Sequence, residues 1–593
     1  MKFLAIALSV FGSAVLAQDI SFAAPDASDA LRAKLRDASL SLALGNDNAP
    51  DSQDYVAAAR ADYRRLLTAL YNDGYFGGTI SIKVNGREAA TLAPLDAPAK
   101  IATIAISVTP GPAFSFGQTQ ITPVHSATVL PNSFAPNLPA KTAVIKQAVT
   151  TAIDGWRDAG HAKAAPSGQS ITARHPQKML DVGVTLAPGP QLRFGQLTVT
   201  GNTDVNAARI ATIAGLPVGE IYAPSQVTLA MRRLRKTGAF DSVSATEADQ
   251  IGPDDTLPIT INVSESKPRR FGFGIELSTI EGLKVSSFWM HRNFLGGAER
   301  LRVDGQISGI GGETGGVDYR LGASFDRPAI YGPDTDLFVR AEITREDEPD
   351  YLIDKASLEI GATRILSDDI VGEIGVGLLT AHEETPNLTR DYTLLTLPLA
   401  ATLDRRDDKT DAKDGYYLRA SATPFLSLQD STSGARFYTD ARAYRTFGDA
   451  GQLTLAGRAQ LGAVLNTQIN NAPADYLFYS GGGGTVRGQS YKSLAVDSVA
   501  GGTTIRTGGL SFAGAQLEAR YQASENIGLV GFYDYGQVSA GADFADATWH
   551  GGVGLGLRYN TGIGPIRLDL GTPAHGADAF GSLQVYIGIG QAF

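Results

Sequence analysis

The sequence of 593 residues contains no cysteine, which excludes disulfide bonds, cysteine-ligated metal centres and cysteine nucleophiles. Histidine is also scarce, and the seven that occur show no spacing typical of zinc ligands. The chain has no phosphate-binding glycine loop and no serine, histidine and aspartate set in a supporting motif. We therefore expect a protein that is not an enzyme and that holds no metal or cofactor.

The sequence has no excess of positive charge either. The 51 basic residues are outnumbered by 61 acidic ones, so the net charge is −10 and no nucleic acid partner is expected. Acidic residues cluster between positions 404 and 414, but they lack the spacing of a calcium loop. We interpret this cluster as a charged turn.

Long apolar runs are absent too, so membrane-spanning helices are not expected. Residues 1–17 instead have the pattern of a secretory signal peptide. Lys2 precedes a short apolar segment over 3–10, and small residues lead up to Gln18. A short N-terminal anchor is the alternative.

Between the signal peptide and residue 266, the chain repeats one module three times. The stretch PGPAFSFGQ at 110–118 returns as PGPQLRFGQ at 188–196, and self-similarity of this kind indicates repeated structural units. The main helices are predicted over 54–72, 141–159 and 225–237, and they stop at Gly74, Gly160 and Gly238. Together with the strands around them, they predict β-α-α-β-β modules over residues 18–111, 112–189 and 190–266. The edge strands of such modules can accept an extended segment by β-augmentation, unless the modules are only spacers.

From residue 267 onward, the hydrophobic pattern changes to alternation with a period of two. In 550–559 and 565–571, apolar residues alternate with glycine, arginine and aspartate. A soluble β-sandwich would not place charged residues on its core face, whereas a transmembrane barrel has lipid on one side and a lumen on the other. The fold class is thus α+β repeats followed by an antiparallel transmembrane β-barrel of about 16 strands over residues 267–593.

A glycine-rich stretch over 480–491 carries one fixed cation, Arg487, which cannot lose its proton. Alternation in a later strand turns both Phe532 and Asp534 toward the lumen, and Glu518 lies on the polar face of the strand before it. We therefore predict that Arg487 docks on an acidic patch of the inner wall. The alternative is a solvated loop with an ordinary surface arginine.

The loop and the acidic strand each carry a short signature. They read Val486-Arg487-Gly488 and Phe532-Tyr533-Asp534-Tyr535-Gly536, and related stretches lie at 292–296, 404–417 and 564–569. On these motifs, nearly all of the mature chain resembles the bacterial outer-membrane BamA/TamA superfamily, in which periplasmic POTRA domains precede a 16-stranded assembly barrel. The resemblance implies a loop-to-lumen latch formed by Val486, Arg487, Gly488, Glu518, Phe532, Asp534 and Gly536. One position departs from the family pattern, because Gln489 stands where an aromatic residue is usual, and Tyr491 is a candidate substitute.

The two ends of the predicted barrel are expected to meet in a weakly paired lateral seam, between strands over 271–279 and 583–589. Gly588 and Gly590 have no side chain to lock this seam, although they could also only relieve crowding in the lumen. The seam residues are expected to be Phe271, Phe273, Ile275, Val585, Ile587, Gly588, Ile589 and Gly590. Alternation also places Phe593 on the apolar face of the last strand, where it serves as a C-terminal barrel signal.

Three POTRA-like modules place the chain nearest to the TamA branch of this superfamily. The resemblance implies a monomeric barrel in contact with outer-membrane lipid, with the N-terminal modules in the periplasm. It also implies unfolded outer-membrane or autotransporter substrates and a TamB-like, inner-membrane-anchored partner at the first module. The alternatives are a central BamA-like insertase, a two-partner secretion transporter that passes a soluble protein through the pore, and a passive channel.

Overall fold

The computed structural model describes residues 19–44, 51–93, 95, 97–278, 282–312, 315–385, 388–429, 432–448, 451–500, 503–562, 564–575 and 579–593. The predicted signal peptide lies outside these residues. The chain divides into two compact units, of which the second comprises Leu197–Leu216, Val227–Glu247 and Ile259–Phe593. Among the described residues, no helix is both long and apolar enough to cross a membrane.

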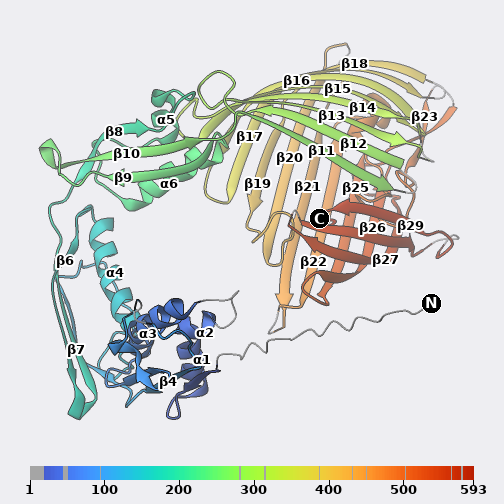
Figure 1. The fold of residues 1–593 in the computed structure, drawn as a ribbon. Coiled ribbons are helices and arrows are strands. Elements are labelled where there is room, and N and C mark those ends of the chain that lie inside the picture. The colour runs from blue at the N-terminus through green and yellow to red at the C-terminus, as the bar shows by residue number, and fades with distance from the viewer. Residues whose placement is uncertain are drawn as a thin grey trace, which may run out of the picture. The chain divides into compact units, whose positions relative to one another are not determined.

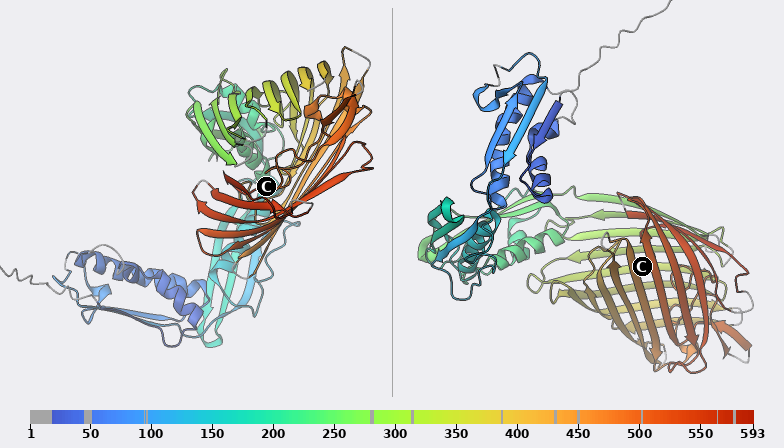
Figure 2. Two further views of the ribbon diagram at one scale, coloured as in Figure 1. Left: turned by 90° about the vertical axis from the view of Figure 1, so that its right-hand side faces the viewer. Right: turned by 90° about the horizontal axis from the view of Figure 1, so that it is seen from below.

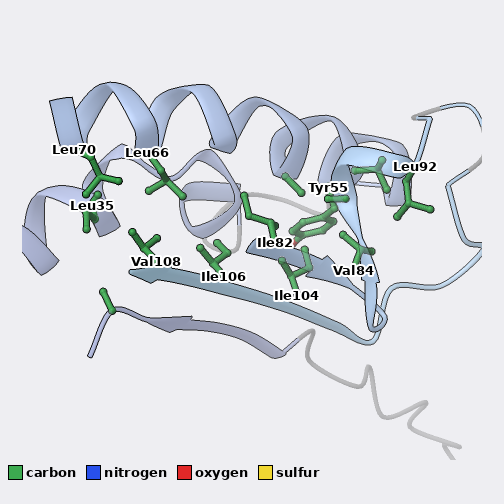
Figure 3. Close-up of a cluster of buried hydrophobic side chains, with 14 of the residues drawn as sticks. Leu35, Tyr55, Leu66, Leu70, Ile82, Val84, Leu92, Ile104, Ile106 and Val108 are labelled. Carbon is green, nitrogen blue, oxygen red and sulfur yellow. The ribbon is translucent and has the colours of Figure 1, made fainter. Parts of the chain in front are cut away.

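The first module is a sheet covered by helices. Its strands are β1 (Asp19–Ala23), β2 (Thr79–Val84), β3 (Arg87–Glu88) and β4 (Thr103–Thr109), in the order β1-β4-β2-β3, and its helices are α1 (Asp29–Ala38), α2 (Leu40–Leu44) and α3 (Ser52–Asn72). Leu66 and Leu70 point from α3 toward Ile82, Ile106 and Val108 on the sheet, and all five are buried (Figure 3). Burial of these apolar side chains is what holds helix and sheet together.

The second module departs from the predicted β-α-α-β-β order. It contains β5 (Ser115–Thr122), one α-helix α4 (Thr142–Asp158), β6 (Ala165–Arg174) and β7 (Met179–Ala187), in the sheet order β5-β7-β6. Residues 123–141 form no α-helix, so the second predicted helix is wrong. This segment contains Pro123, Pro131, Pro136 and Pro139, and proline removes a backbone donor and clashes with the preceding turn of a helix.

The third module has the predicted order. It consists of β8 (Arg193–Thr200), α5 (Ala207–Ala214), α6 (Pro224–Lys236), β9 (Phe240–Glu247) and β10 (Thr256–Glu265), with the sheet order β8-β10-β9. The predicted helix stops at Gly74, Gly160 and Gly238 all have positive φ, at 90°, 95° and 69°. Glycine reaches this conformation without steric cost, and it therefore ends all three main helices.

Residues 269–589 form a closed antiparallel barrel (Figure 1 and Figure 2). Its strands are β11 (Arg269–Ser278), β12 (Gly282–His291), β13 (Arg300–Ile310), β14 (Asp318–Arg327), β15 (Thr335–Glu348), β16 (Tyr351–Ile365), β17 (Ile370–Thr385), β18 (Leu388–Thr396), β19 (Leu399–Asp404), β20 (Gly415–Ser427), β21 (Ser433–Phe447), β22 (Leu453–Leu465), β25 (Ser511–Gln522), β26 (Ile527–Ser539), β27 (Thr548–Thr561), β28 (Gly564–Pro573) and β29 (Gln584–Ile589). Both β18 and β19 pair with β17 and with β20, so they are two halves of one strand, interrupted at Leu397 and Pro398. Within the described residues, the barrel thus has the predicted 16 strands.

Side chains alternate between the two faces of the barrel as predicted. On β26, Phe532 and Asp534 are buried, whereas Leu529 and Tyr533 are 49% and 39% exposed on the outside. The long connection between β22 and β25 contains the glycine-rich loop and a small hairpin of β23 (Val496–Ala500) and β24 (Thr503–Thr507). The barrel therefore encloses a polar interior within an apolar outer surface, as a membrane barrel requires.

The helices of the third module pack on turns of the barrel. Ala298 and Ala329, from two turns between strands, belong to the same buried cluster as Ile213 and Leu234. Arg233 on α6 also binds Asp334 with two parallel hydrogen bonds, Nε to Oδ1 at 2.7 Å and Nη2 to Oδ2 at 2.6 Å. A paired guanidinium and carboxylate of this geometry fixes orientation as well as distance.

The family-like stretch at 292–296 lies at this same junction. The Asn293 side-chain amide donates to the backbone carbonyl of Asp204 at 2.9 Å, and the backbone N–H of Asn206 donates to Gly296 at 2.8 Å. This motif therefore joins the turn before α5 to the turn between β12 and β13.

Glu265, the last residue of β10, holds the turn that precedes α5. Its Oε1 accepts the backbone N–H groups of Thr203 and Val205 at 2.8 and 2.9 Å, and Asp204 donates to it at 3.1 Å. Burial alone would raise the pKa of Glu265, but these backbone donors lower it more, so the pKa lies below its ordinary value.

We expect acid to release this turn in the intact protein. Because the folded pKa of Glu265 is lowered, its stabilising contribution is complete above the ordinary carboxyl pKa and is lost as the pH falls through the folded value. Hydrogen-exchange protection factors for residues 203–205 should therefore decrease on acidification in the wild-type chain. Glu265→Gln should give low protection at every pH, whereas the exposed control Glu220→Gln should behave as wild type. Equal protection in the Glu265→Gln and wild-type chains would contradict this role.

Candidate functional site

The glycine-rich loop lies against the inner wall of the barrel. Its backbone folds back on itself through bridges between Ser480 and Leu494 and between Gly482 and Val486. Val486 and Arg487 stand at the tip and are 0% and 1% exposed. The loop is therefore a seated element of the barrel interior and not a solvated hairpin.

Arg487 is surrounded by carboxylates. Its Nε and Nη2 donate to the two oxygens of Asp534 at 2.8 and 2.9 Å, and its backbone N–H donates to Asp534 Oδ2 at 3.0 Å. Nη1 donates to Glu518 at 2.6 Å and to Asp569 at 3.2 Å. All four residues are almost fully buried. Because each bond joins charged groups away from water, this set is stronger than the same bonds on a surface.

An aromatic ring completes the site of the guanidinium. The Cζ atom of Arg487 lies 3.6 Å from the centre of the Phe532 ring. A planar guanidinium over a ring face gains a cation–π interaction, and it keeps its edge free for the carboxylates. Phe532 and Asp534 are two residues apart on β26, so one face of one strand supplies both contacts.

The charges around Arg487 balance. Arg520 donates to the second oxygen of Glu518 at 2.8 Å, and Arg558 donates to the second oxygen of Asp569 at 2.5 Å. Three guanidinium groups thus face three carboxylates, and each of the outer acids is shared by two arginines. Such balance is needed because a buried charge without a partner costs several kcal/mol or more, on the order of a whole domain's stability.

Glycines on the wall allow the loop backbone to approach closely. A Cβ atom at Gly536 on β26 would lie 2.1 Å from the Ser480 hydroxyl, and one at Gly552 on β27 would lie 1.8 Å from the Arg487 carbonyl oxygen. Neither distance is possible for a real side chain. The predicted latch glycine Gly536 therefore acts by leaving room for the loop, and Gly552 does the same on the next strand.

Gly488 and Gln489 make two further contacts with the wall. Gly488 has a φ of 88°, and its backbone N–H donates to the Tyr586 hydroxyl at 3.2 Å. The Gln489 side-chain amide donates to the Gly551 carbonyl at 2.8 Å. Tyr491 does not take this place, because its hydroxyl donates to Glu348 on β15. A hydrogen bond from Gln489 thus attaches the loop at the position where the family usually has an aromatic ring.

The structure brings all seven predicted latch residues together, and it adds four that the sequence did not single out: Asp569, Arg520, Arg558 and Tyr586. Alternation along β28 and the related stretch at 564–569 were the available signals for Asp569. These signals place Asp569 on the lumenal face, but many other charged residues lie there too. Which of them contacts Arg487 depends on the strand against which the loop packs, and the sequence does not show this.

Along its described residues, β11 has little backbone pairing with β29. Leu277 pairs with Ile587 and Ser278 with Tyr586, whereas residues 269–276 pair with β12 but not with β29. Of the predicted seam residues, Ile587 is paired across the seam with Leu277. Phe271, Phe273 and Ile275 lie on the outer face of β11, 64%, 84% and 72% exposed. Val585, Gly588 and Ile589 lie on β29, and Gly590 follows it with a φ of 93°.

A side chain from β28 reaches over β29 to β11. Arg567 and Gly588 are paired in register, and Arg567 Nη2 lies 3.6 Å from Glu276 on β11. A Cβ atom at Gly588 would lie 3.2 Å from Arg567 Nε. Gly588 thus leaves space for this ion pair, which supplements the backbone pairing of the seam.

The predicted outward position of Phe593 is wrong. The last strand ends at Ile589, and Phe593 is 8% exposed in a cluster with Ala412, Tyr444 and Ala456. Alternation fails here because the positive φ of Gly590 turns the chain out of the strand.

The acidic cluster at 404–414 forms a turn, as predicted. Asp407 Oδ1 accepts the backbone N–H groups of Lys413 and Asp414, and Asp408 Oδ1 accepts those of Thr410 and Asp411. The carboxylates thus accept hydrogen bonds from the backbone N–H groups of their own turn.

The chain combines α/β modules with a closed barrel, and an arginine of a lumenal loop binds an aspartate of the barrel wall. This combination is typical of proteins with POTRA domains and a β-barrel. Residues 293–593 match the Omp85 superfamily domain, and residues 192–266 match the POTRA family described as surface antigen variable number repeat. The chain belongs to the Omp85 superfamily. It is an outer-membrane protein with POTRA structure in the periplasm.

Two solved structures show the same fold. The crystal structure of BamA from Haemophilus ducreyi lacking POTRA domains 1–3 matches with a TM-score of 0.63 and 14% identity, over 80% of this chain and 100% of that one. CdiB from Acinetobacter baumannii matches with a TM-score of 0.52 and 12% identity, over 81% of this chain and 90% of that one.

We expect Arg487→Ala to destabilise the barrel by about 3–5 kcal/mol, because it leaves buried carboxylates without their shared cation. Urea unfolding of the purified protein in vesicles measures this loss. Arg442→Ala is the matched control on the same wall, since Asp440 keeps Arg458 as a partner at 2.8 Å. An Arg487→Ala midpoint equal to that of the control would show that the latch contributes no stability.

Gly552→Ala should unseat the loop without changing any charge, because its new methyl group overlaps the Arg487 carbonyl. Gly531→Ala is the control on the neighbouring strand, where the nearest atom to a Cβ lies at 4.0 Å. Hydrogen exchange in the peptide 480–491 should increase for the first variant only. Unchanged exchange in Gly552→Ala would contradict the close approach.

Proposed function

We propose that this protein is an outer-membrane assembly factor of the TamA type, which guides unfolded β-barrel or autotransporter substrates from its POTRA modules to the lateral seam. The observation that carries the proposal is the seam itself, where residues 269–276 of β11 pair with β12 but not with β29. Unpaired backbone in a bilayer costs several kcal/mol per group, so such an edge favours pairing with an incoming strand.

The chemistry of the seam fits an extended substrate. An edge strand offers a row of backbone donors and acceptors, and it binds another strand through them with little dependence on sequence. The outward side chains of β11 are apolar, as are those of a substrate strand that must face lipid. Folding and burial of the substrate would supply the free energy.

Three sheet-and-helix modules before the barrel support the TamA branch over the central insertase of the BamA type. On this proposal, a TamB-like partner anchored in the inner membrane docks at the first module. The two-partner secretion alternative receives less support, because its expected plugging helix is not found within residues 19–44. There, Leu31 and Leu35 of α1 are buried in the core of the first module.

Depletion of the protein followed by outer-membrane proteomics distinguishes these functions. We expect loss of a subset of barrels or autotransporters, since a TamA-type factor serves some substrates and not all. Loss of nearly all barrels would instead indicate the central insertase, and loss of a single exported protein would indicate two-partner secretion.

A covalent lock on the seam should abolish assembly. Because the chain has no cysteine, Leu277→Cys with Ile587→Cys introduces the sole pair, at positions that are already in register. We expect oxidation to stop substrate assembly and reduction to restore it. The control pair Ile275→Cys with Val285→Cys joins β11 to β12 and leaves the seam free. Full activity of the oxidised seam variant would reject lateral opening.

A further inference from the structure

Residues 590–593, which follow β29, lie inside the barrel and not in its wall. After β29, the backbone N–H of Gly590 donates to the Pro565 carbonyl at 2.7 Å, and the positive φ of Gly590 turns the following residues inward. We call residues 590–593 the C-terminal tail. Two of its residues, Gln591 and Phe593, make specific contacts with lumenal side chains.

Phe593 occupies a formed site. Arg520 Nη2 donates to the Phe593 backbone oxygen at 3.2 Å, and the Arg520 guanidinium lies 5.4 Å from the centre of its ring. The Tyr444 ring lies 6.4 Å away, and the methyl groups of Ala412 and Ala456 line the rest of the cluster. A buried cation, an aromatic ring and two small apolar residues are suited to one aromatic side chain with its backbone oxygen.

Gln591 is held from two sides. Arg558 Nε donates to its side-chain oxygen at 2.8 Å, and its side-chain amide donates to Asp411 at 2.9 Å. Asp411 belongs to the charged turn between β19 and β20, and Arg520 Nη1 also donates to Ala412 of that turn at 3.5 Å. The tail is therefore fixed to the turn and to the wall at the same time.

The two arginines that hold the tail are the same two that complete the site of Arg487. Arg520 shares Glu518 with Arg487, at 2.8 and 2.6 Å. Arg558 shares Asp569 with Arg487, at 2.5 and 3.2 Å. Each arginine thus uses part of its donor set on an acid of the latch and another part on the tail.

We propose that this part of the lumen is a binding site for the chain's own C-terminal residues, and that Arg520 and Arg558 couple its occupancy to the seating of Arg487. When Arg487 leaves, Glu518 and Asp569 each lose a donor that they shared. Arg520 and Arg558 then turn their remaining donors toward these acids, because a buried carboxylate with unmet hydrogen bonds costs more than a neutral carbonyl. The contacts to Phe593 and Gln591 are lost in exchange.

The coupling has a consequence for the seam that does not depend on which substrate the protein serves. The tail begins one residue after β29, so a seated tail holds the end of this strand inside the lumen. Release of the loop frees that end. By thermodynamic reciprocity, removal of the tail must loosen the loop by the same factor.

Crosslinking in the full-length protein tests the site. Ala412→Cys with Ala592→Cys introduces the sole cysteines at the turn and in the tail, and a short bifunctional maleimide reports how often the two are close. We expect efficient crosslinking in this background. Arg520→Gln should lower the fraction of seated tail by removing a direct contact, and Arg487→Ala should lower the equilibrium constant for tail seating by about 5- to 150-fold for a coupling of ordinary size. Arg442→Gln, on the same wall but without contact to the tail, should leave it unchanged.

Two readouts separate the parts of the proposal. If Arg520→Gln crosslinks as well as the parent, the proposed site for Phe593 does not exist. If Arg520→Gln fails to crosslink but Arg487→Ala crosslinks normally, the site stands and the coupling is overturned. Where Arg487→Ala does not fold, Gly552→Ala displaces the loop with every charge intact and must lower crosslinking in its place.

The reciprocal experiment uses hydrogen exchange without any label. Deletion of Phe593 should increase exchange of the Arg487 and Gly488 backbone amides, which donate to Asp534 and Tyr586 in the seated loop. Exchange in the first module, around Leu66, serves as the internal control and should not change. Unchanged exchange at Arg487 after this deletion would contradict the coupling.

Discussion

The structure depends on one constraint: a permanent cation, Arg487, is buried in the lumen and must be neutralised there. Asp534 binds it through two side-chain bonds, and Glu518 and Asp569 complete the shell. Because a single missing partner would leave a buried charge, these contacts strongly favour one relative arrangement of the loop, β25, β26 and β28. The glycines of β26 and β27 follow from the same constraint, since the loop must approach the wall within backbone contact.

The buried ion pairs of the lumen compensate for the sparse pairing between β11 and β29. Residues 269–276 of β11 do not pair with β29, an arrangement that would be a defect in a barrel held together by its wall alone. Here the contacts across the lumen keep the C-terminal third of the barrel in place. The seam can then remain weakly paired, and local opening in a protein begins where stability is lowest.

Much of this site followed from alternation. A period of two put Phe532, Asp534 and Glu518 on the lumenal face, and the structure confirms these faces. The same rule failed for Phe593, because it holds only while the chain stays in a strand, and Gly590 ends the strand first. The absent helix of the second module is a comparable failure: the repeat predicted it, but four prolines in 123–141 prevented it.

The sequence by itself determined the elements and their faces: the modules with glycine-stopped helices, the alternating strands, and an arginine in a loop that could approach a wall closely. These are local properties, set by side-chain spacing and by backbone freedom. Only the tertiary structure decided that Asp569 joins Asp534 and Glu518 around Arg487, that Arg520 and Arg558 serve both loop and tail, and that residues 269–276 of β11 do not pair with β29. Such contacts join residues from 31 to 82 positions away, and up to hundreds across the seam, and they depend on strand register and closure of the barrel. No local pattern encodes them.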